Sequence, residues 1–118
     1  MPVHDQPLEA DDDDCLLAYV TMPDKAAARE FCETLVRERL AACANILDGA
    51  DSVYWWRDTL ETARECVCIF KTTRRRYPAF EARALETHPY ETPCIVAWPL
   101  ERGLGDFLNW IRAETTPR

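Results

Sequence analysis

The longest extended segment of the chain is residues 41–73, and its length limits the folds available. The first arm is apolar on both sides of Gly49, and a glycine inside an extended run indicates a bulge or bend rather than a strand end. Residues 57–60 predict a turn, after which residues 61–73 form a second strand. The segment therefore predicts one hairpin with arms of about 13–15 residues, or roughly 45 Å.

The elements on either side of this hairpin complete a recognisable order. Residues 15–20 are a continuous apolar run of strand length, and Pro23 begins an amphipathic helix. Pro78 stands early in a second helix, residues 94–98 form a fourth strand, and a short helix begins near residue 104. The order β-α-β-β-α-β predicts an α+β, ferredoxin-like sandwich, in which two helices cover one face of an antiparallel four-stranded sheet.

The outer strands are too short to pair with the whole hairpin. The uncovered part carries Val53, Tyr54, Trp55 and Trp56, and an exposed apolar edge of this kind promotes aggregation. Pairing with another copy of the chain removes the hazard, so we expect a homo-oligomer.

Charge and hydropathy exclude several functions. The chain of 118 residues has a net charge of −7. Binding to nucleic acids or to anionic membranes requires a basic protein surface, so the charge argues against both functions. Residues 74–76, all arginine, are the one basic cluster and suit either a solvated helix start or a small-anion site. No apolar run approaches a membrane span of about 20 residues, and no signal peptide is visible. We expect a cytoplasmic protein with a disordered acidic leader at residues 1–14 and one domain at residues 15–118.

Six cysteines are present, and each has apolar neighbours. None forms a C-x-x-C motif, so we expect reduced thiols in the core. Cys66 and Cys68 share one face of a strand, at a strained distance for a disulfide. Core packing is the simpler interpretation, and a soft metal ion is the alternative.

Residues 88–93 (His-Pro-Tyr-Glu-Thr-Pro) make a rigid corner between the second helix and the last strand. His88 suits Cu(II) or Zn(II) ligation with Glu91, or it caps the helix end. Lys71, inside an apolar strand, needs an anionic partner, either Glu91 or a small anionic ligand. Tyr54 and Trp56 share a strand face and suit subunit packing or ligand stacking.

Several segments in order resemble the CutA family of divalent-cation (copper) tolerance proteins. The resemblance runs from about residue 15 to 115 and rests on residues 21–24 (TMPD), 39–46 (RLAACANI), 52–56 (SVYWW), 70–72 (FKT), 88–93 (HPYETP) and 107–111 (FLNWI).

The resemblance implies a homotrimer shaped like the PII signalling proteins, with clefts between subunits. The resemblance implies that five residues lie at such a cleft: Tyr54, Trp56, Lys71, Tyr90 and Glu91. The family's copper ligands are a cysteine before the TMPD segment, the histidine of HPY and the residue preceding it. Here Val20 and Thr87 stand at the first and last of these positions, so His88 alone remains.

Three functions follow. The first is a trimeric CutA-type protein of the metal-ion response that binds Cu(II) or a similar divalent ion weakly, with His88, Glu91 and Cys43 as candidate ligands and no organic cofactor. The second is a PII-like module that binds a small anion or partner protein between subunits. The third, an enzyme using Cys43 and His88, lacks a third orienting group, so we expect no catalysis.

Overall fold

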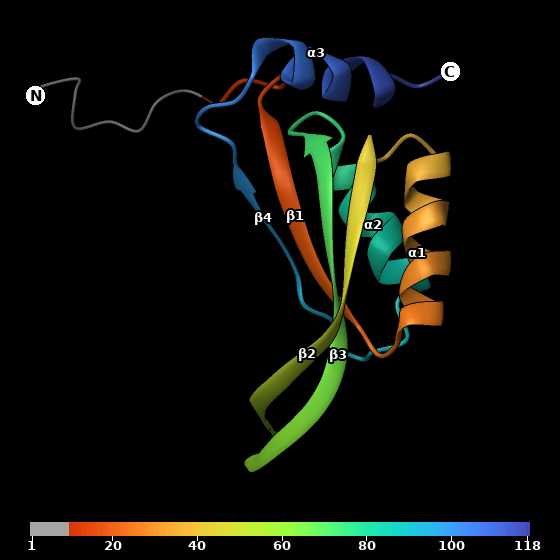
Figure 1. The fold of residues 1–118 in the computed structure, drawn as a ribbon, viewed down its shortest axis with the longest axis vertical. Helices are drawn as coiled ribbons and strands as arrows, with labels where there is room; N and C mark the ends of the chain where they lie inside the picture. Colours follow the sequence, from red (N-terminus) through yellow and green to blue (C-terminus); the bar gives the residue numbers. More distant parts are fainter. Residues whose placement is uncertain (1–9) are drawn as a thin grey trace, which may run out of the picture.

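The computed structural model describes residues 10–118 and contains seven regular elements, shown in Figure 1. In chain order they are β1 (Cys15–Met22), α1 (Lys25–Arg37), β2 (Cys43–Trp56), β3 (Thr59–Thr73), α2 (Tyr77–Thr87), β4 (Ile95–Pro99) and α3 (Gly105–Glu114). The strands form one antiparallel sheet in the order β2-β3-β1-β4. The predicted ferredoxin-like arrangement is confirmed.

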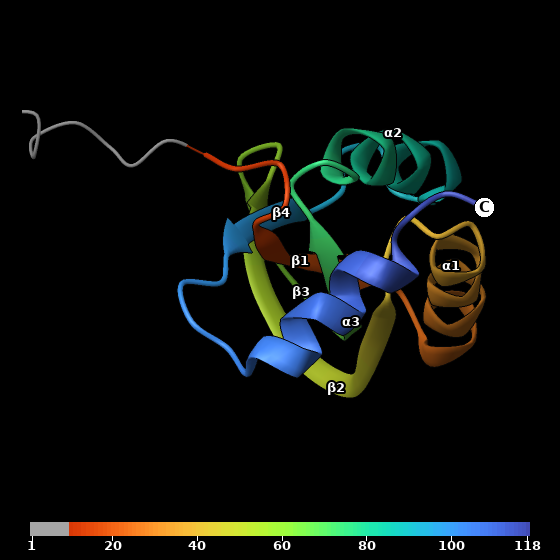
Figure 2. The ribbon, with the colours of Figure 1, turned by 90° about the horizontal axis from the view of Figure 1, so that it is seen from above.

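Helices α1 and α2 lie together on one face of the sheet, and α3 crosses its upper end (Figures 1 and 2). Asp24 begins α1 as its N-cap, because its carboxylate accepts a hydrogen bond of 2.8 Å from the Ala27 amide. Helix α2 has Pro78 in its first turn and ends at Thr87, immediately before His88 and Pro89. Both proline signals in the sequence therefore mark real helix boundaries.

The core lies between the helices and the inner face of β1 and β3. Phe70 and Phe80 are fully buried and meet edge to face at 4.9 Å between ring centroids. Cys32, Cys66 and Cys68 are buried in the same cluster, and all six cysteines are unpaired. All six were expected in the core, but Cys94 is exposed and Cys43 is only half-buried.

The hairpin extends beyond the rest of the sheet, as its length predicted. Strand β1 ends at Met22, opposite Cys66. From Glu65 back to Thr59, β3 pairs with β2 on one side, and its other edge is unpaired in the described chain. Arg57 and Asp58 form the tip, both with positive φ (50° and 64°), which is the geometry of a two-residue hairpin turn. The turn is therefore shorter than the four residues expected.

A bulge in β2 decides which side chains face the open side of the sheet. The register shifts between Leu47 and Ala50, where Gly49 has a φ of +81°. Before the bulge, odd-numbered residues such as Asn45 share a face with Ile69. After it, even-numbered residues do so, and Tyr54 lies opposite Glu61. The inserted residue thus turns Tyr54 and Trp56 toward the open face.

The acidic segment before β1 is ordered where the structure describes it, contrary to the expectation of a disordered leader reaching residue 14. Residues 11–14 form a turn, in which the Asp14 amide donates to the Asp11 carbonyl at 2.9 Å. Arg75 forms ion pairs with Asp12 and Asp13 at 3.5 and 3.4 Å. The arginine cluster therefore holds this turn against the domain. Residues 1–9 of the expected leader lie outside the described residues.

Candidate functional site

His88 is a structural link between α2 and β1. Its imidazole is buried, with 9% of the residue exposed. Its Nδ1 accepts a hydrogen bond of 3.1 Å from the Tyr90 amide, so Nε2 carries the proton and donates it to the Thr21 carbonyl at 2.8 Å. Burial lowers the pKa of His88, opposed by the bond to Thr21 and by the charge of Glu65. Both ring nitrogens are therefore occupied by backbone partners.

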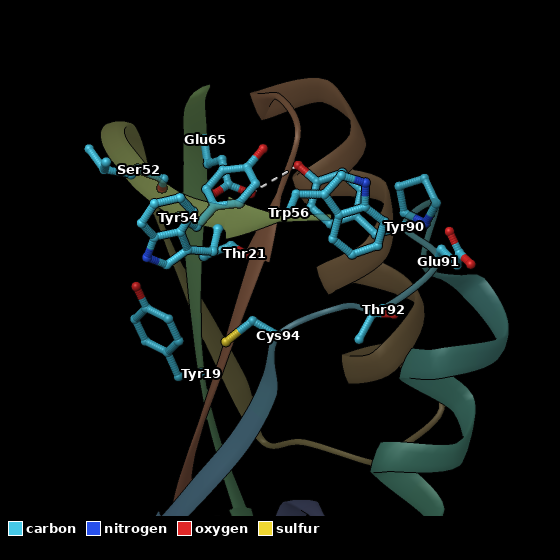
Figure 3. Close-up of a pocket in the computed structure, with 13 residues that line it drawn as sticks. Tyr19, Thr21, Ser52, Tyr54, Trp56, Glu65, Tyr90, Glu91, Thr92 and Cys94 are labelled. Carbon is cyan, nitrogen blue, oxygen red and sulfur yellow. Dashed lines mark hydrogen bonds between the residues drawn. The ribbon is translucent and has the colours of Figure 1, made fainter. Parts of the chain in front are cut away.

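Tyr90, two residues on, reaches across to β3. Its hydroxyl donates a hydrogen bond of 2.9 Å to Glu65 Oε2, the dashed line in Figure 3. Burial and this bond raise the pKa of Tyr90, so the phenol stays neutral at physiological pH. Glu65 itself is only 8% exposed. The pair fixes the loop after α2 to the base of the projecting hairpin.

The hairpin, β1 and this loop line a half-open cavity of about 830 Å³ on the open face of the sheet. Figure 3 shows the side chains of Tyr54, Trp56 and Tyr90 on the same side as Glu65. Cys94 and Tyr19 complete the wall nearest β4 and β1. Burial, and then the charge of Glu65, raise the pKa of the Cys94 thiol, which keeps it protonated. The cavity is thus largely aromatic, with carboxylates as its charged groups.

Glu91 lies at the rim of this cavity and contacts the tip of the hairpin. Its carboxylate pairs with the Arg57 guanidinium at 3.1 Å, and the same guanidinium stands 5.2 Å from the centre of the Trp56 ring. The Arg57 guanidinium therefore forms an ion pair with Glu91 and a cation–π contact with Trp56 at the same time.

Lys71 lies elsewhere on the open face, and of its two suggested partners Glu91 pairs instead with Arg57 within the chain. Its ammonium donates to the Asn45 side-chain oxygen. Lys71 lies six positions beyond Glu65 along β3, or about 20 Å at the strand rise. Within one chain Lys71 therefore lies away from the cavity, which is lined by Tyr54, Trp56, Tyr90 and Glu91. The cleft between subunits, to which all five residues were assigned, stays a prediction.

The predicted metal ligands are not brought together. Cys43 lies opposite Lys71, whereas His88 contacts Thr21, which lies opposite Val67. Val67 and Lys71 are four positions apart along β3, or about 13 Å, so His88 and Cys43 lie at different levels of the sheet. Within residues 10–118, no group of three His, Cys, Asp or Glu side chains has a geometry suited to a metal ion. The set of His88, Glu91 and Cys43 does not fit a divalent cation in one chain.

Comparison with known proteins agrees with the motifs. The chain matches the family model described as CutA1 divalent ion tolerance protein over residues 16–114. This chain belongs to the CutA1 family. Divalent-cation tolerance protein CutA of Thermus thermophilus is 38% identical over 99 residues, covering 84% of this chain and 96% of the relative. The Archaeoglobus fulgidus protein of the same name is 39% identical over 93 residues, 79% and 90% of the two chains.

Solved CutA1 structures share the fold. CutA from Xylella fastidiosa superposes with a TM-score of 0.85 at 37% identity and covers 87% of this chain and 99% of its own. CutA1 from Oryza sativa gives a TM-score of 0.85 at 33% identity, covering 87% and 94%. The shared fold therefore agrees with the CutA1 assignment made from the sequence match.

Three residues at or beside this cavity were missed from the sequence. Glu65 could have been found, since strand alternation places it on the face of Ile69 and Lys71. Arg57 could not, because its contacts with Trp56 and Glu91 depend on how the hairpin turns toward the loop after α2. Cys94 was assigned to the core because its neighbours are apolar.

Proposed function

We propose that this protein acts in divalent-cation tolerance as a homotrimer of ferredoxin-like subunits. Membership of the CutA1 family supports the first part, and the relatives are named for that property. The observation that carries the assembly is the hairpin projecting beyond β1, whose Val53, Trp55 and Leu60 are 65%, 73% and 57% exposed.

Apolar surface is exposed at both ends of the folded subunit (Figure 1), which supports self-association. At the opposite end, α3 exposes Phe107 and Trp110, which stack at 5.4 Å, beside Leu104 at 75% exposure. A monomer rarely leaves so many large apolar side chains in water. Each unpaired edge also offers backbone groups to a neighbour. The family resemblance implies three copies.

Metal binding, in this proposal, is weak and does not use His88. The imidazole has no free nitrogen, while the Glu91 side chain is 69% exposed. One accessible carboxylate, with water completing the shell, provides few protein ligands and hence low affinity for Cu(II) or a similar ion.

Calorimetric titration of the reduced protein with Cu(II) tests this assignment. We expect weak heats that are unchanged by His88→Ala and reduced by Glu91→Gln. Loss of Cu(II) binding in correctly folded His88→Ala would instead restore the imidazole as the ligand.

The alternative of a PII-like module for a small anion loses its main support. Among the described residues, no lysine, arginine or histidine lines the cavity, and Lys71 bonds Asn45. We further propose a binding rather than a catalytic role, because Cys43 and His88 lie apart and the pKa of Cys43 is raised by burial.

We also propose that the protein works in the cytoplasm. Six unpaired cysteines suit a reducing compartment. One A. fulgidus structure is described as a periplasmic divalent cation tolerance protein, so location needs its own test. Cell fractionation with compartment markers provides it, and recovery outside the cytoplasm would contradict the proposal. In the described part of the chain, no helix is long and apolar enough to cross a membrane.

A further inference from the structure

The Glu65 carboxylate lacks a charged partner within its own subunit. The residue is 8% exposed, and its hydrogen bond among the described residues is to the neutral phenol of Tyr90. In the same part of the chain, no lysine, arginine or histidine lines the cavity beside it. A buried carboxylate is costly unless a cation or several donors accompany it. Glu65 is therefore incomplete in a single subunit.

Lys71 is the cation that shares the open face of the sheet with Glu65. Strand register and alternation place three charged residues on that face in the described sheet: Glu61 and Glu65 toward the projecting hairpin, and Lys71 at the other end. The Lys71 ammonium bonds the neutral side chain of Asn45. The open face thus carries opposite charges about 20 Å apart along β3.

The same face is the surface that a neighbouring subunit must cover. Val53 and Trp55 line the cavity and are 65% and 73% exposed, so a subunit that buries them also excludes water from Glu65. Arg57 is committed to Glu91 and offers no compensation. A head-to-tail contact repeated around a three-fold axis places one end of a face against the other end of the next copy. Such a contact brings the two opposite charges together.

From this complementarity we propose that Lys71 of one subunit enters the cavity of the next and forms an ion pair with Glu65 there. One oxygen of that carboxylate, Oε2, accepts the Tyr90 hydroxyl, and the other accepts the ammonium. The aromatic wall formed by Tyr54 and Trp56 suits the alkyl stem of the entering lysine. The pairing rests on the trimer proposed above, contributes three ion pairs to it, and assigns the cavity to a second copy of the chain.

A cysteine pair tests the contact directly. Lys71→Cys with Glu65→Cys, in a chain that also carries Cys43→Ser and Cys94→Ser, removes both charges and the two native thiols that are not buried. Within one chain the two sites are too far apart for a disulfide, whose Cα atoms stand less than about 7 Å apart. Oxidised glutathione should therefore link two and then three chains on a non-reducing gel. Lys71→Cys with Glu30→Cys, whose second site is on the exposed side of α1, is the matched control and should stay unlinked.

A double-mutant cycle measures the charge pairing itself. Lys71→Met and Glu65→Gln each leave one charge without its partner, and each should weaken the trimer at least about thirtyfold in sedimentation equilibrium. The double variant removes both charges and should be weakened no more than either single variant. Circular dichroism checks that each variant is folded. A double variant weakened by the product of the two single effects would show that the two residues act separately, which would overturn the pairing.

The gel and the molar mass together separate this contact from the assembly on which it rests. A trimeric mass without linked chains would overturn the contact between Lys71 and Glu65 and leave the trimer in place. A linked product that stops at two chains would indicate a two-fold contact and overturn the ring of three ion pairs. A monomeric mass of the unaltered protein would contradict the trimer, and the contact with it.

Discussion

The Nε2 atom of His88 donates a hydrogen bond of 2.8 Å to the carbonyl oxygen of Thr21. This bond joins the end of α2 to the end of β1, and Nδ1 of the same ring orders the loop by accepting from the Tyr90 amide. The histidine of the HPY segment is therefore a positioning residue for Tyr90, and through it for Glu65.

Replacing His88 should cost stability rather than metal affinity. His88→Ala leaves two backbone groups without their partner and opens space beside Phe31, whose ring lies 5.6 Å away. We expect a loss of about 2 kcal/mol in the free energy of unfolding, measured by urea denaturation. Thr87→Ala is the control, because the Thr87 hydroxyl makes only local bonds to its own helix, and it should change stability by less than about 0.5 kcal/mol.

Stability should fall as the solution is acidified through the titration range of His88. The pKa of His88 is lowered in the folded state, chiefly by burial, so the unfolded chain binds the proton first. The contribution is complete above about pH 6.5, the ordinary value. It is lost as the pH falls from there through the lowered folded pKa. His88→Ala should show a smaller loss over that range. An equal pH dependence in both proteins would assign the effect to other groups.

The hairpin turn and the bulge should respond to glycine in opposite ways. Asp58 has a φ of 64°, which costs a non-glycine residue about 1 kcal/mol, so Asp58→Gly should raise stability by roughly 0.5–1 kcal/mol. Gly49 has a φ of +81°, and an added Cβ would stand 2.8 Å from an Arg64 nitrogen. Because that side chain can move, backbone strain is the main penalty, and Gly49→Ala should lower stability by about 1 kcal/mol. Thermal unfolding of both variants measures the contrast, and the same sign in both would contradict the assignment.

The acidic turn before β1 should contribute a small, salt-dependent stabilisation. Asp12 and Asp14 pair with Arg75 and Arg74 at 3.5 Å each, but the four side chains are between 35% and 65% exposed. Exposed pairs contribute less than about 1 kcal/mol each. Asp12→Asn with Asp14→Asn should lower stability by roughly 0.5–1 kcal/mol at low ionic strength and by much less in 1 M salt, where screening is strong. A loss that does not change with salt would indicate hydrogen bonding instead.

The fold was accessible from the sequence because its signals are local. Pro23 and Asp24 mark the start of α1, and Gly49 marks the bulge. Pro78 in the first turn of α2 and Pro89 beyond its end mark the limits of that helix. These signals act within a few residues, and the order of elements then fixes the topology. The turn was misjudged because Arg57 and Asp58 both occupy a conformation that usually selects asparagine or glycine.

The site was only partly accessible because its contacts join distant segments. Tyr54, Trp56, Tyr90 and Glu91 were expected at a cleft between subunits, and within one chain they line one cavity. Lys71 was grouped with them by the family resemblance, but the length of β3 carries it about 20 Å away. The acidic turn was taken as disordered from its composition, which does not reveal that residues 74–76 pair with it.

The molar mass of the reduced protein in solution, by light scattering or sedimentation equilibrium, tests the assembly most directly. The projecting hairpin and the exposed aromatic residues predict a mass three times the 13.6 kDa of one chain, unchanged on dilution to micromolar concentration. A mass of 13.6 kDa under those conditions would contradict the account, because the hairpin would then remain stable in water without a partner.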